Sequence, residues 1–324
     1  MPHNTHGYSS TPPELHVAVG VTKNQRGEIL IACRPDHVHQ GGLWEFPGGK
    51  VEPGETVGEA LQRELHEELA MTVEQATPLI KIRHDYGDKR VLLDVWRVDA
   101  FSGNPQGREK QAIRWVFPDE LLGFQFPAAN RPIVAAARLP DYYPIVNGGQ
   151  GDEEALLASL ERLCEGGYPL AQWRVNIHDE SAYLNLTRRA VKHCRTRGLG
   201  LILNADPAWV IPTGAAGVHL NRERLMALRE RPLPRSLWVG ASCHDPTEIR
   251  QAEQAGVDFA LLSPVLPTPS HPEARPLGWQ QFAAWVDQAK LPVFALGGMT
   301  RAKLAQAKQS GAQGIAGIRG FGDA

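Results

Sequence analysis

The sequence predicts two domains of different classes, an α+β sandwich over residues 15–139 and a compact (β/α)8 barrel over residues 141–324. The first part combines short apolar runs with a Gly-rich turn that leads into an acidic helix. In the second part, eight short apolar runs alternate with helical stretches, which is the pattern of parallel βαβ units in a (β/α)8 barrel or a doubly wound sheet. The chain stops soon after the eighth run, so we expect a TIM-type barrel without its last helix. Residues 1–14 are polar and contain prolines, which indicates a loose tail.

In the first domain, strands are predicted where apolar runs flank turn-forming residues. The runs His16–Thr22 and Ile29–Cys33 enclose a Lys-Asn-Gln-Arg-Gly segment, which favours a hairpin. The other elements expected here are strands at Leu79–His84, Val91–Val98 and Ile113–Phe117 and a second helix at Arg131–Leu139.

The first helix should begin after Thr56, because Glu59 lies three residues later and completes a capping box. Every fourth position from Val57 to Leu69 is apolar and supplies a buried stripe.

Three carboxylates, Glu64, Glu67 and Glu68, share a neighbouring face of that helix. At this spacing they repel one another, and a divalent cation converts the repulsion into coordination. Mg²⁺ prefers oxygen ligands and is commonly shared between carboxylates and substrate phosphates. The segment therefore predicts a metal–diphosphate site, with a solvated acidic helix as the alternative.

The alternation of the second domain defines its elements. The eight strands are expected at Tyr142–Val146, Leu170–Val175, Leu199–Leu203, Gly217–Leu220, Leu237–Gly240, Phe259–Leu262, Val293–Leu296 and Gly314–Gly317. The helical stretches between them include Glu153–Cys164, Ser181–Arg197, Thr247–Ala255 and Arg301–Gln309.

Composition excludes several classes of function. The net charge of −2 gives no reason to expect binding of a nucleic-acid polymer. No apolar run reaches the roughly 18 residues of a membrane span, and the N-terminus lacks the apolar core of a secretory signal. The four cysteines show no metal-type spacing, which favours a reduced, cytoplasmic setting. The oligomeric state is not predicted.

The acidic helix is one part of a longer motif. Gly49 is followed at fixed spacing by Glu55 and then by Arg-Glu-Leu-x-Glu-Glu, from Arg63 to Glu68. This pattern resembles the Nudix box, and it departs from the box where Ala70 replaces a glycine. That glycine ends the helix in the left-handed backbone region, which suits Gly better than Ala.

The Nudix resemblance implies a Mg²⁺ site, with Mn²⁺ as the alternative ion. The implied ligands are the carboxylates of Glu64, Glu67, Glu68 and Glu109 and the backbone of Gly48 and Gly49. Glu64 or Glu67 would also assist deprotonation of the attacking water. Glu55 would support catalysis by pairing with Arg63 and bracing the loop against the helix.

The resemblance is strongest to the MutT branch, whose members hydrolyse oxidised guanine nucleotides. Phe126 opens a Phe-Pro-x-Ala-Asn segment of that branch, so Asn130 would read the base with its amide donor and acceptor. An Asn130 that serves in a turn or as a helix cap is the alternative. Arg34 would grip phosphate or be a surface arginine, and Phe46 would line the base pocket or the core.

The second domain resembles thiamine phosphate synthase and its relative TenI over nearly all of residues 141–322. The residues that carry this resemblance are Gln172-Trp173-Arg174, Gly217-Val218-His219-Leu220 and the segment from Ser263 to Thr268. Gly297 and Gly298 would form a backbone cradle for a phosphate-bearing ligand, with tight-turn glycines as the alternative.

Several departures from the synthase pattern remove its metal and diphosphate ligands. Ala205 follows Asn204 where the family has a metal-binding Asp, Arg224 stands at the second such position, and His271 replaces a lysine. The lysine after Gln-x-Arg is also absent. We therefore expect no synthase activity. His244 would be the acid–base residue of a TenI-like tautomerase, or the barrel would be a non-catalytic ligand-binding or structural domain.

Together these features predict a Mg²⁺-dependent nucleoside triphosphate pyrophosphohydrolase. Its expected substrate is 8-oxo-dGTP, converted to 8-oxo-dGMP and pyrophosphate, which would clear the nucleotide pool of a mutagenic precursor. The alternative is a thiamine-pathway protein whose first domain hydrolyses a thiamine-related diphosphate.

Overall fold

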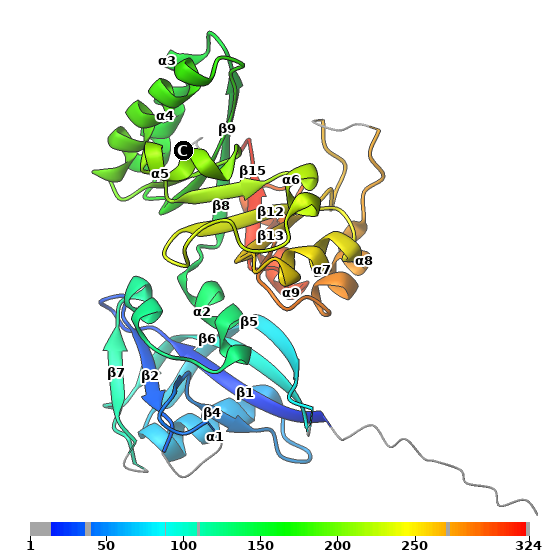
Figure 1. The fold of residues 1–324 in the computed structure, drawn as a ribbon. Helices are drawn as coiled ribbons and strands as arrows, with labels where there is room; N and C mark the ends of the chain where they lie inside the picture. The colour runs from blue at the N-terminus through cyan, green and yellow to red at the C-terminus, as the bar shows by residue number, and fades with distance from the viewer. Residues whose placement is uncertain (1–13, 36–39, 88, 109–110, 270–272, 322–324) are drawn as a thin grey trace, which may run out of the picture.

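The computed structural model describes residues 14–35, 40–87, 89–108, 111–269 and 273–321. It contains two domains, a mixed α/β domain that ends with helix α2 and a closed barrel that begins with strand β8 (Figure 1). The predicted fold class is confirmed. Within the described ranges, no helix is both long enough and apolar enough to cross a membrane.

The first domain is built from two sheets and two main helices. Its elements are β1 (Glu14–Thr22), β2 (Ile29–Cys33), β3 (Trp44–Glu45), β4 (Gly48–Lys50), α1 (Val57–Leu69), β5 (Thr72–Asp85), β6 (Arg90–Ser102), β7 (Ile113–Val116), the 3-10 helices η1 (Pro118–Gly123) and η2 (Ala128–Asn130), and α2 (Arg131–Arg138). The first sheet has the strand order β4-β1-β6-β5 and the second has β3-β2-β7. Because β1 begins at Glu14, the strand starts two residues earlier than the predicted run His16–Thr22.

The expected hairpin between the first two strands is wrong. β1 pairs with β4 in antiparallel and with β6 in parallel fashion, so both of its edges are occupied. β2 belongs to the other sheet, and a single bridge, Lys23 to Ile29, is found at the turn in this described segment. The turn itself forms, because the side chain of Asn24 accepts hydrogen bonds from the backbone of Arg26 and Glu28.

Helix α1 follows the local rules that predicted it. The backbone of Glu59 donates to the Thr56 hydroxyl, and the Glu59 carboxylate accepts from the Thr56 backbone, which completes the capping box. Leu61 and Leu65 are fully buried against β1. A Cβ at Gly20 of β1 would lie 3.1 Å from a methyl group of Leu65, so this glycine permits close helix–sheet packing.

The second domain is a closed barrel of eight parallel strands in the order β10-β11-β12-β13-β14-β15-β8-β9. Its strands are β8 (Tyr142–Gly149), β9 (Leu170–Asn176), β10 (Gly200–Leu203), β11 (Gly217–Leu220), β12 (Trp238–Cys243), β13 (Phe259–Leu262), β14 (Val293–Leu296) and β15 (Gly314–Gly317). Its helices are α3 (Glu153–Glu165), α4 (Glu180–Arg195), η3 (Pro207–Trp209), α5 (Val210–Thr213), α6 (Arg222–Ala227), α7 (Pro246–Gln254), α8 (Gly278–Val286), η4 (Arg301–Lys303) and α9 (Leu304–Gln309).

The barrel closes without a helix in the described residues after β15. There Phe321 is buried and packs edge-on against Tyr142 of β8, with 6.0 Å between ring centroids. This contact covers the outer surface near the seam between the last and first strands.

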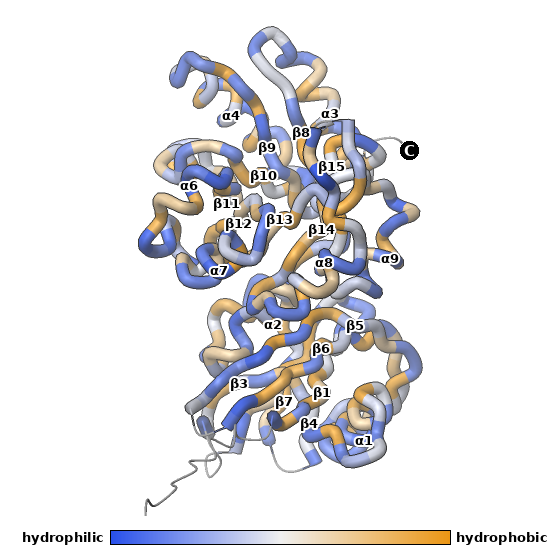
Figure 2. The backbone as a smooth tube through the Cα atoms, turned by 90° about the vertical axis from the view of Figure 1, so that its right-hand side faces the viewer, coloured by the Kyte–Doolittle hydropathy of each residue, from blue (hydrophilic) through white to orange (hydrophobic). Residues whose placement is uncertain are grey.

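The first domain closes one end of the barrel. Ala135 and Leu139 join a buried cluster with Tyr143, Phe259 and other barrel-interior side chains, and Figure 2 shows α2 at the junction of the two domains. The side chain of Gln313, just before β15, donates to backbone oxygens of α2 and Leu139. Since these contacts lie where the strands begin, the carboxyl ends of the strands open at the opposite end of the barrel.

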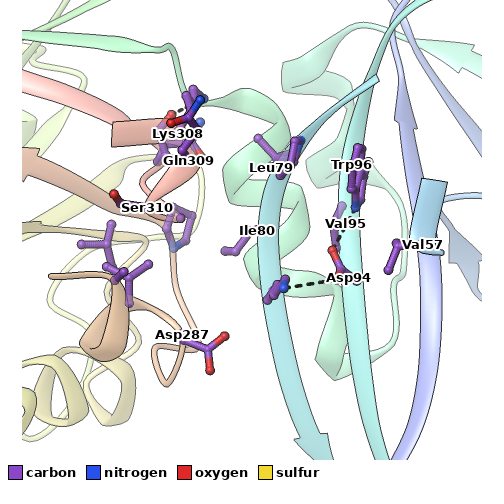
Figure 3. A pocket seen from close by; sticks show the side chains of 18 of the residues that line it. Val57, Leu79, Ile80, Asp94, Val95, Trp96, Asp287, Lys308, Gln309 and Ser310 are labelled. Carbon is purple, nitrogen blue, oxygen red and sulfur yellow. Dashed lines mark hydrogen bonds and ion pairs between the residues drawn. The ribbon is translucent and has the colours of Figure 1, made fainter. Parts of the chain in front are cut away.

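Ion pairs at the periphery join the domains. Arg83 of β5 donates to the Asp287 carboxylate at 2.9 Å, and Asp141 accepts from Arg97 at 3.2 Å and from Lys308 at 2.6 Å. Between these contacts lies a cleft of about 590 Å³, here called the large interdomain cleft. Figure 3 shows Lys308 and Gln309 of the barrel on one side and the strands of the first domain on the other.

Candidate active site

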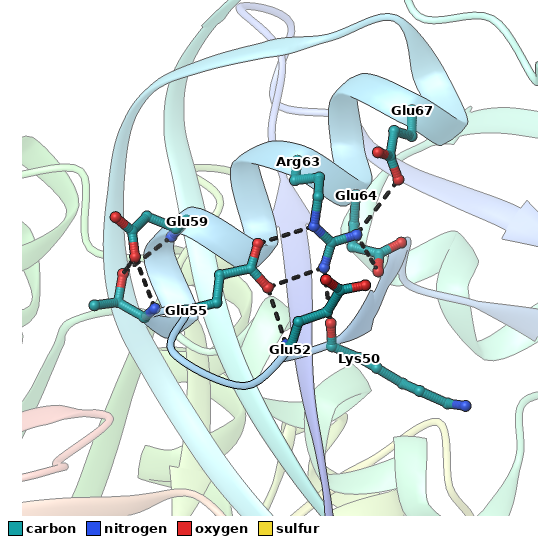
Figure 4. A network of polar contacts seen from close by, with 8 residues as sticks. Lys50, Glu52, Glu55, Glu59, Arg63, Glu64 and Glu67 are labelled. Carbon is teal, nitrogen blue, oxygen red and sulfur yellow. Dashed lines mark hydrogen bonds and ion pairs between the residues drawn. The ribbon is translucent and has the colours of Figure 1, made fainter.

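Arg63 organises the carboxylates of α1. Its Nε and second terminal nitrogen donate to the two carboxylate oxygens of Glu55, at 2.8 and 3.0 Å (Figure 4). The other terminal nitrogen donates to Glu64 at 2.8 Å and lies 3.4 Å from Glu67. Hydrogen bonds from Arg63 and from the backbone of Glu52 lower the pKa of Glu55 to about 2. The pairing expected from the sequence therefore forms.

The glycines of β4 let the backbone approach the helix. A Cβ at Gly49 would lie 2.1 Å from the carboxyl carbon of Glu64, so no side chain fits at this position. Gly48 has a φ of +150°, and a Cβ there would lie 2.1 Å from the carbonyl oxygen of Ala18. Backbone and carboxylate oxygens are thus brought together beside α1.

A loop adjoins the C-terminal half of the same helix. The backbone N–H of Arg108 donates to the carbonyl oxygen of Glu68 at 2.9 Å, and the backbone of Gln106 donates to Leu69. The next residue after Arg108 is Glu109, the predicted loop ligand, which lies outside the described residues. Its role stays a prediction.

The residues present fit a divalent cation in chemistry but do not form a preassembled cage. In the described part of the chain, no three His, Cys, Asp or Glu side chains converge as a metal cluster. The Glu64 side chain is 16% exposed, whereas that of Glu67 is 58% exposed and projects toward solvent. Mg²⁺ commonly takes one or two carboxylates together with waters and substrate phosphates. A partly open set of oxygen donors is compatible with that mode of binding.

A second group of polar residues lies on β3 and the end of β2. Arg34 forms an ion pair with Glu45, and burial raises the pKa of Glu45 against the opposing effect of Arg34. Burial also raises the pKa of Tyr86, which is close enough to feel the charges of both residues. Sequence reasoning proposed Arg34 alone. Glu45 and Tyr86 were missed, although Glu45 stands between the aromatic residues of the segment that leads into the box.

Asn130 ends η2 and occupies the N-cap position of α2, but its side chain makes no capping hydrogen bond. Its residue surface is 9% exposed, and its side chain has no hydrogen-bond partner among the residues that the structure describes. Its amide atoms are not among the fully buried side-chain atoms that lack a partner, so the amide is accessible and available to a ligand. Phe46 is buried in the core and stacks on Phe126, with 5.4 Å between ring centroids. The partly exposed Phe126, rather than Phe46, presents an aromatic surface on this segment.

The open end of the barrel carries a histidine–carboxylate pair. The Glu248 carboxylate accepts from the backbone of His244 at 2.8 Å and lies 2.9 Å from its Nδ1. Its other oxygen pairs with Arg222. The His244 side chain is 47% exposed and that of Glu248 is 2% exposed, so a buried carboxylate orients an accessible imidazole. This arrangement supports proton transfer, which stays a prediction for the barrel.

Close packing accounts for the glycines of the expected phosphate cradle. Gly297 and Gly298 have φ values of +96° and +66°. A Cβ at Gly297 would lie 2.9 Å from Pro264, and one at Gly298 would lie 2.7 Å from Leu266. Both positions therefore need glycine whether or not phosphate binds, and the cradle stays a prediction.

Arg174, at the end of β9, is a cation that the site prediction omitted. Its Nε donates to Asn147 at 2.8 Å, but within the described ranges no carboxylate lies within ion-pair distance. Burial lowers its pKa. Burial also lowers the pKa of His219 to about 3, with Arg174 adding to the effect, so His219 is neutral near pH 7. Asp206 follows Ala205, the position where the synthase family has a metal-binding Asp. Its carboxylate accepts a hydrogen bond from the backbone of Ala208 and so caps η3.

Comparison with known proteins assigns each half of the chain. The family model of the Nudix domain matches residues 18–136, and that of thiamine monophosphate synthase matches residues 142–321. The first half is 37% identical over 122 residues to the 8-oxo-dGTP diphosphatase of Escherichia coli, a match that covers 38% of this chain and 95% of that enzyme. The chain belongs to both families. Its Nudix half is a hydrolase that acts on diphosphate bonds.

Two further relatives are similar to one half of the chain each. The Nudix half is 39% identical over 110 residues to the CTP pyrophosphohydrolase of Escherichia coli, covering 34% of this chain and 82% of that enzyme. The barrel is 32% identical over 175 residues to the thiamine-phosphate synthase of Thiobacillus denitrificans, covering 53% of this chain and 83% of that enzyme.

Proposed function

We propose that the Nudix domain hydrolyses 8-oxo-dGTP to 8-oxo-dGMP and pyrophosphate. The observation that carries this proposal is the amide of Asn130, which belongs to a residue only 9% exposed and has no protein partner in the described part of the chain. An amide supplies one acceptor and two donors, which matches the changed donor and acceptor pattern of an oxidised purine. A site with unpaired buried polar groups discriminates strongly against a base that leaves them unpaired.

The chain's own groups divide the remaining work. Glu64, Glu67 and Glu68, with the backbone of Gly48 and Gly49, would hold Mg²⁺, which neutralises diphosphate charge and lowers the pKa of a bound water. Glu64 or Glu67 accepts the proton of the attacking water.

Arg63 is a positioning residue in this scheme. It holds the carboxylates of Glu55 and Glu64 in fixed places before the substrate arrives, and such preorganisation accounts for much of catalysis by charged groups. The proposed reaction breaks the bond between the α- and β-phosphates. Water attacks phosphorus at that bond, and the products are nucleoside monophosphate and pyrophosphate.

For the barrel we propose a phosphate-bearing small molecule as ligand, without synthase activity. Arg174 has no carboxylate counter-ion in the described ranges, and the pair of His244 and Glu248 is suited to acid–base chemistry. The open end of the barrel lies away from the domain junction, which gives no support to direct transfer of a product between the two sites. Hydrolysis of a thiamine-related diphosphate by the Nudix domain is therefore the second candidate function.

The experiment that separates the candidates compares substrates at equal, sub-saturating concentration with Mg²⁺. The nucleotides 8-oxo-dGTP, dGTP and CTP are scored by pyrophosphate release, and thiamine diphosphate by release of phosphate. We expect the largest kcat/KM for 8-oxo-dGTP. Faster turnover of thiamine diphosphate would move the function into thiamine metabolism, and faster turnover of CTP would overturn the base assignment.

A further inference from the structure

A second, smaller cleft separates the two domains near the C-terminal end of β5. It has a volume of about 260 Å³ and is here called the small interdomain cleft. The Nudix side contributes Ile82, His84 and the turn from Ala128 to Arg131, and the barrel side contributes the loops that contain Arg235 and Lys290.

Its charges differ from those of the large interdomain cleft. There, Lys81 lies 3.4 Å from Asp94, Lys308 lies 2.6 Å from Asp141, and Asp287 is paired with Arg83. The charged groups of the large cleft therefore already satisfy one another.

In the small interdomain cleft, cations are in excess. The side chains of Arg131 and Arg235 make no hydrogen bond or ion pair with any residue in the described ranges. Lys290 donates its backbone N–H to Glu253, but its side chain has no ion pair in the same ranges. Asp258 is already bound by both terminal nitrogens of Arg231, which lies behind the cleft. The lining therefore has three cations, Arg131, Arg235 and Lys290. Its two carboxylates are Glu253 and Asp258, and only Glu253 is not bound by Arg231.

These like charges influence one another. Partial burial lowers the pKa of Arg235, repulsion from Arg231 and Arg131 adds to that effect, and attraction to Asp258 opposes it. Lys290 likewise adds to the effect of burial in lowering the pKa of His84 on the facing strand. Cations gathered from two domains around one hollow are poorly arranged for stability, and a multivalent anion would convert their repulsion into charge-assisted hydrogen bonds.

We propose that the small interdomain cleft binds a compact phosphate-type anion, inorganic phosphate or pyrophosphate, between Arg131 and Arg235. Guanidinium groups bind phosphate oxygens through pairs of parallel hydrogen bonds, and here one group comes from each domain. A hollow of about 260 Å³ lies below the 300–1,000 Å³ usual for larger organic ligands, which favours a small anion. The inference does not depend on the nucleotide assignment.

An anion bound in the small interdomain cleft would influence the proposed base site at Asn130. Arg131 directly follows Asn130, so an anion held by Arg131 would fix the turn that presents the Asn130 amide. The anion would be either pyrophosphate, which is the product expected from the Nudix domain, or free phosphate. Both present phosphate oxygens to the two arginines.

The test is calorimetric titration of the full-length chain with phosphate and with pyrophosphate, in metal-free buffer so that the carboxylate site is not loaded. We expect the Arg131→Gln/Arg235→Gln double variant to bind at least tenfold more weakly than the unaltered chain. The Arg131→Lys/Arg235→Lys double variant should bind the anion with intermediate affinity because both positive charges remain. Arg195→Gln, which removes an exposed arginine on α4, should bind normally.

Two results would overturn the proposal. One is equal affinity of the unaltered chain and the Gln/Gln variant. The other is loss of binding in Arg174→Gln together with normal binding in the Gln/Gln variant, which would assign the anion to the barrel mouth. The melting temperature of each variant without ligand controls for folding, and it should not fall in the Gln/Gln variant because a repulsive pair is removed.

Discussion

Arg63 binds both carboxylate oxygens of Glu55, at 2.8 and 3.0 Å, and so fixes the loop before α1 to the middle of that helix. A planar guanidinium matches a carboxylate in this two-point geometry, which a lysine cannot reproduce. The same guanidinium reaches Glu64, so the brace and the proposed metal ligands form one unit.

The pair of Arg63 and Glu55 should make the free energy of unfolding depend on pH in the acid range. Folding lowers the pKa of Glu55 from 4.5 to about 2, so its contribution is present above pH 4.5 and is lost as the pH falls toward 2. In Glu55→Gln, the fall in unfolding free energy between pH 4.5 and 2 should be shallower. Urea unfolding at several pH values measures this slope, with the exposed neighbour Glu52→Gln as control. Identical slopes in all three proteins would contradict the pairing.

Glu67→Gln should lower turnover at least about 100-fold, the low end of what general acid–base groups contribute. The fold should be unaffected because the Glu67 side chain is largely exposed. Pyrophosphate release and circular dichroism measure the two properties. Glu74→Gln, an exposed carboxylate on β5, should retain full activity, and retained activity in Glu67→Gln would remove this residue from the catalytic set.

Ala70 adopts a left-handed conformation, with φ of 58° and ψ of 32°, at the end of α1. Glycine occupies this region without steric penalty, so Ala70→Gly should raise the free energy of unfolding by about 0.5–1 kcal/mol. Gly54→Ala provides the opposite control, because its φ is +88° and a Cβ would meet no atom within 4 Å. It should destabilise through backbone strain alone. Destabilisation by Ala70→Gly would contradict this account of the helix end.

The buried junction should make the two domains unfold together. Leu139→Ala removes a side chain shared by α2 and the barrel interior, so it should destabilise the chain by about 2–4 kcal/mol. Unfolding followed by tryptophan fluorescence and by loss of Nudix activity should shift to the same extent. Leu122→Ala, at a position 40% exposed, should have little effect. Separate transitions for the two signals would show that the junction does not couple the domains.

The parts of the fold that sequence reasoning predicted are those with local signals. The capping box fixed the start of α1, and four barrel strands have the predicted bounds because short apolar runs are bounded by turns. Helix α8 was not among the helical stretches named from the sequence, because its two polar side chains, Gln280 and Gln281, are adjacent and show no helical period. The pairing of β1 with β6 is non-local and leaves no sign in either strand.

The same distinction applies to the candidate site. Glu64, Glu67 and Glu68 were recognised because they lie within one motif on one helix. Glu45 and Tyr86 join Arg34 through tertiary packing, and the excess of cations between Arg131 and Arg235 exists because two domains meet there. Spacing along the chain carries no record of such contacts.

The central claim is that the amide of Asn130 reads an oxidised base. The most direct measurement is the ratio of kcat/KM for 8-oxo-dGTP to that for dGTP, determined with Mg²⁺ for the unaltered chain and for Asn130→Ala. We predict a ratio well above one in the unaltered chain and a fall of at least tenfold in the variant, with turnover of dGTP little changed. A ratio near one in the unaltered chain, or the same ratio in both proteins, would contradict the account.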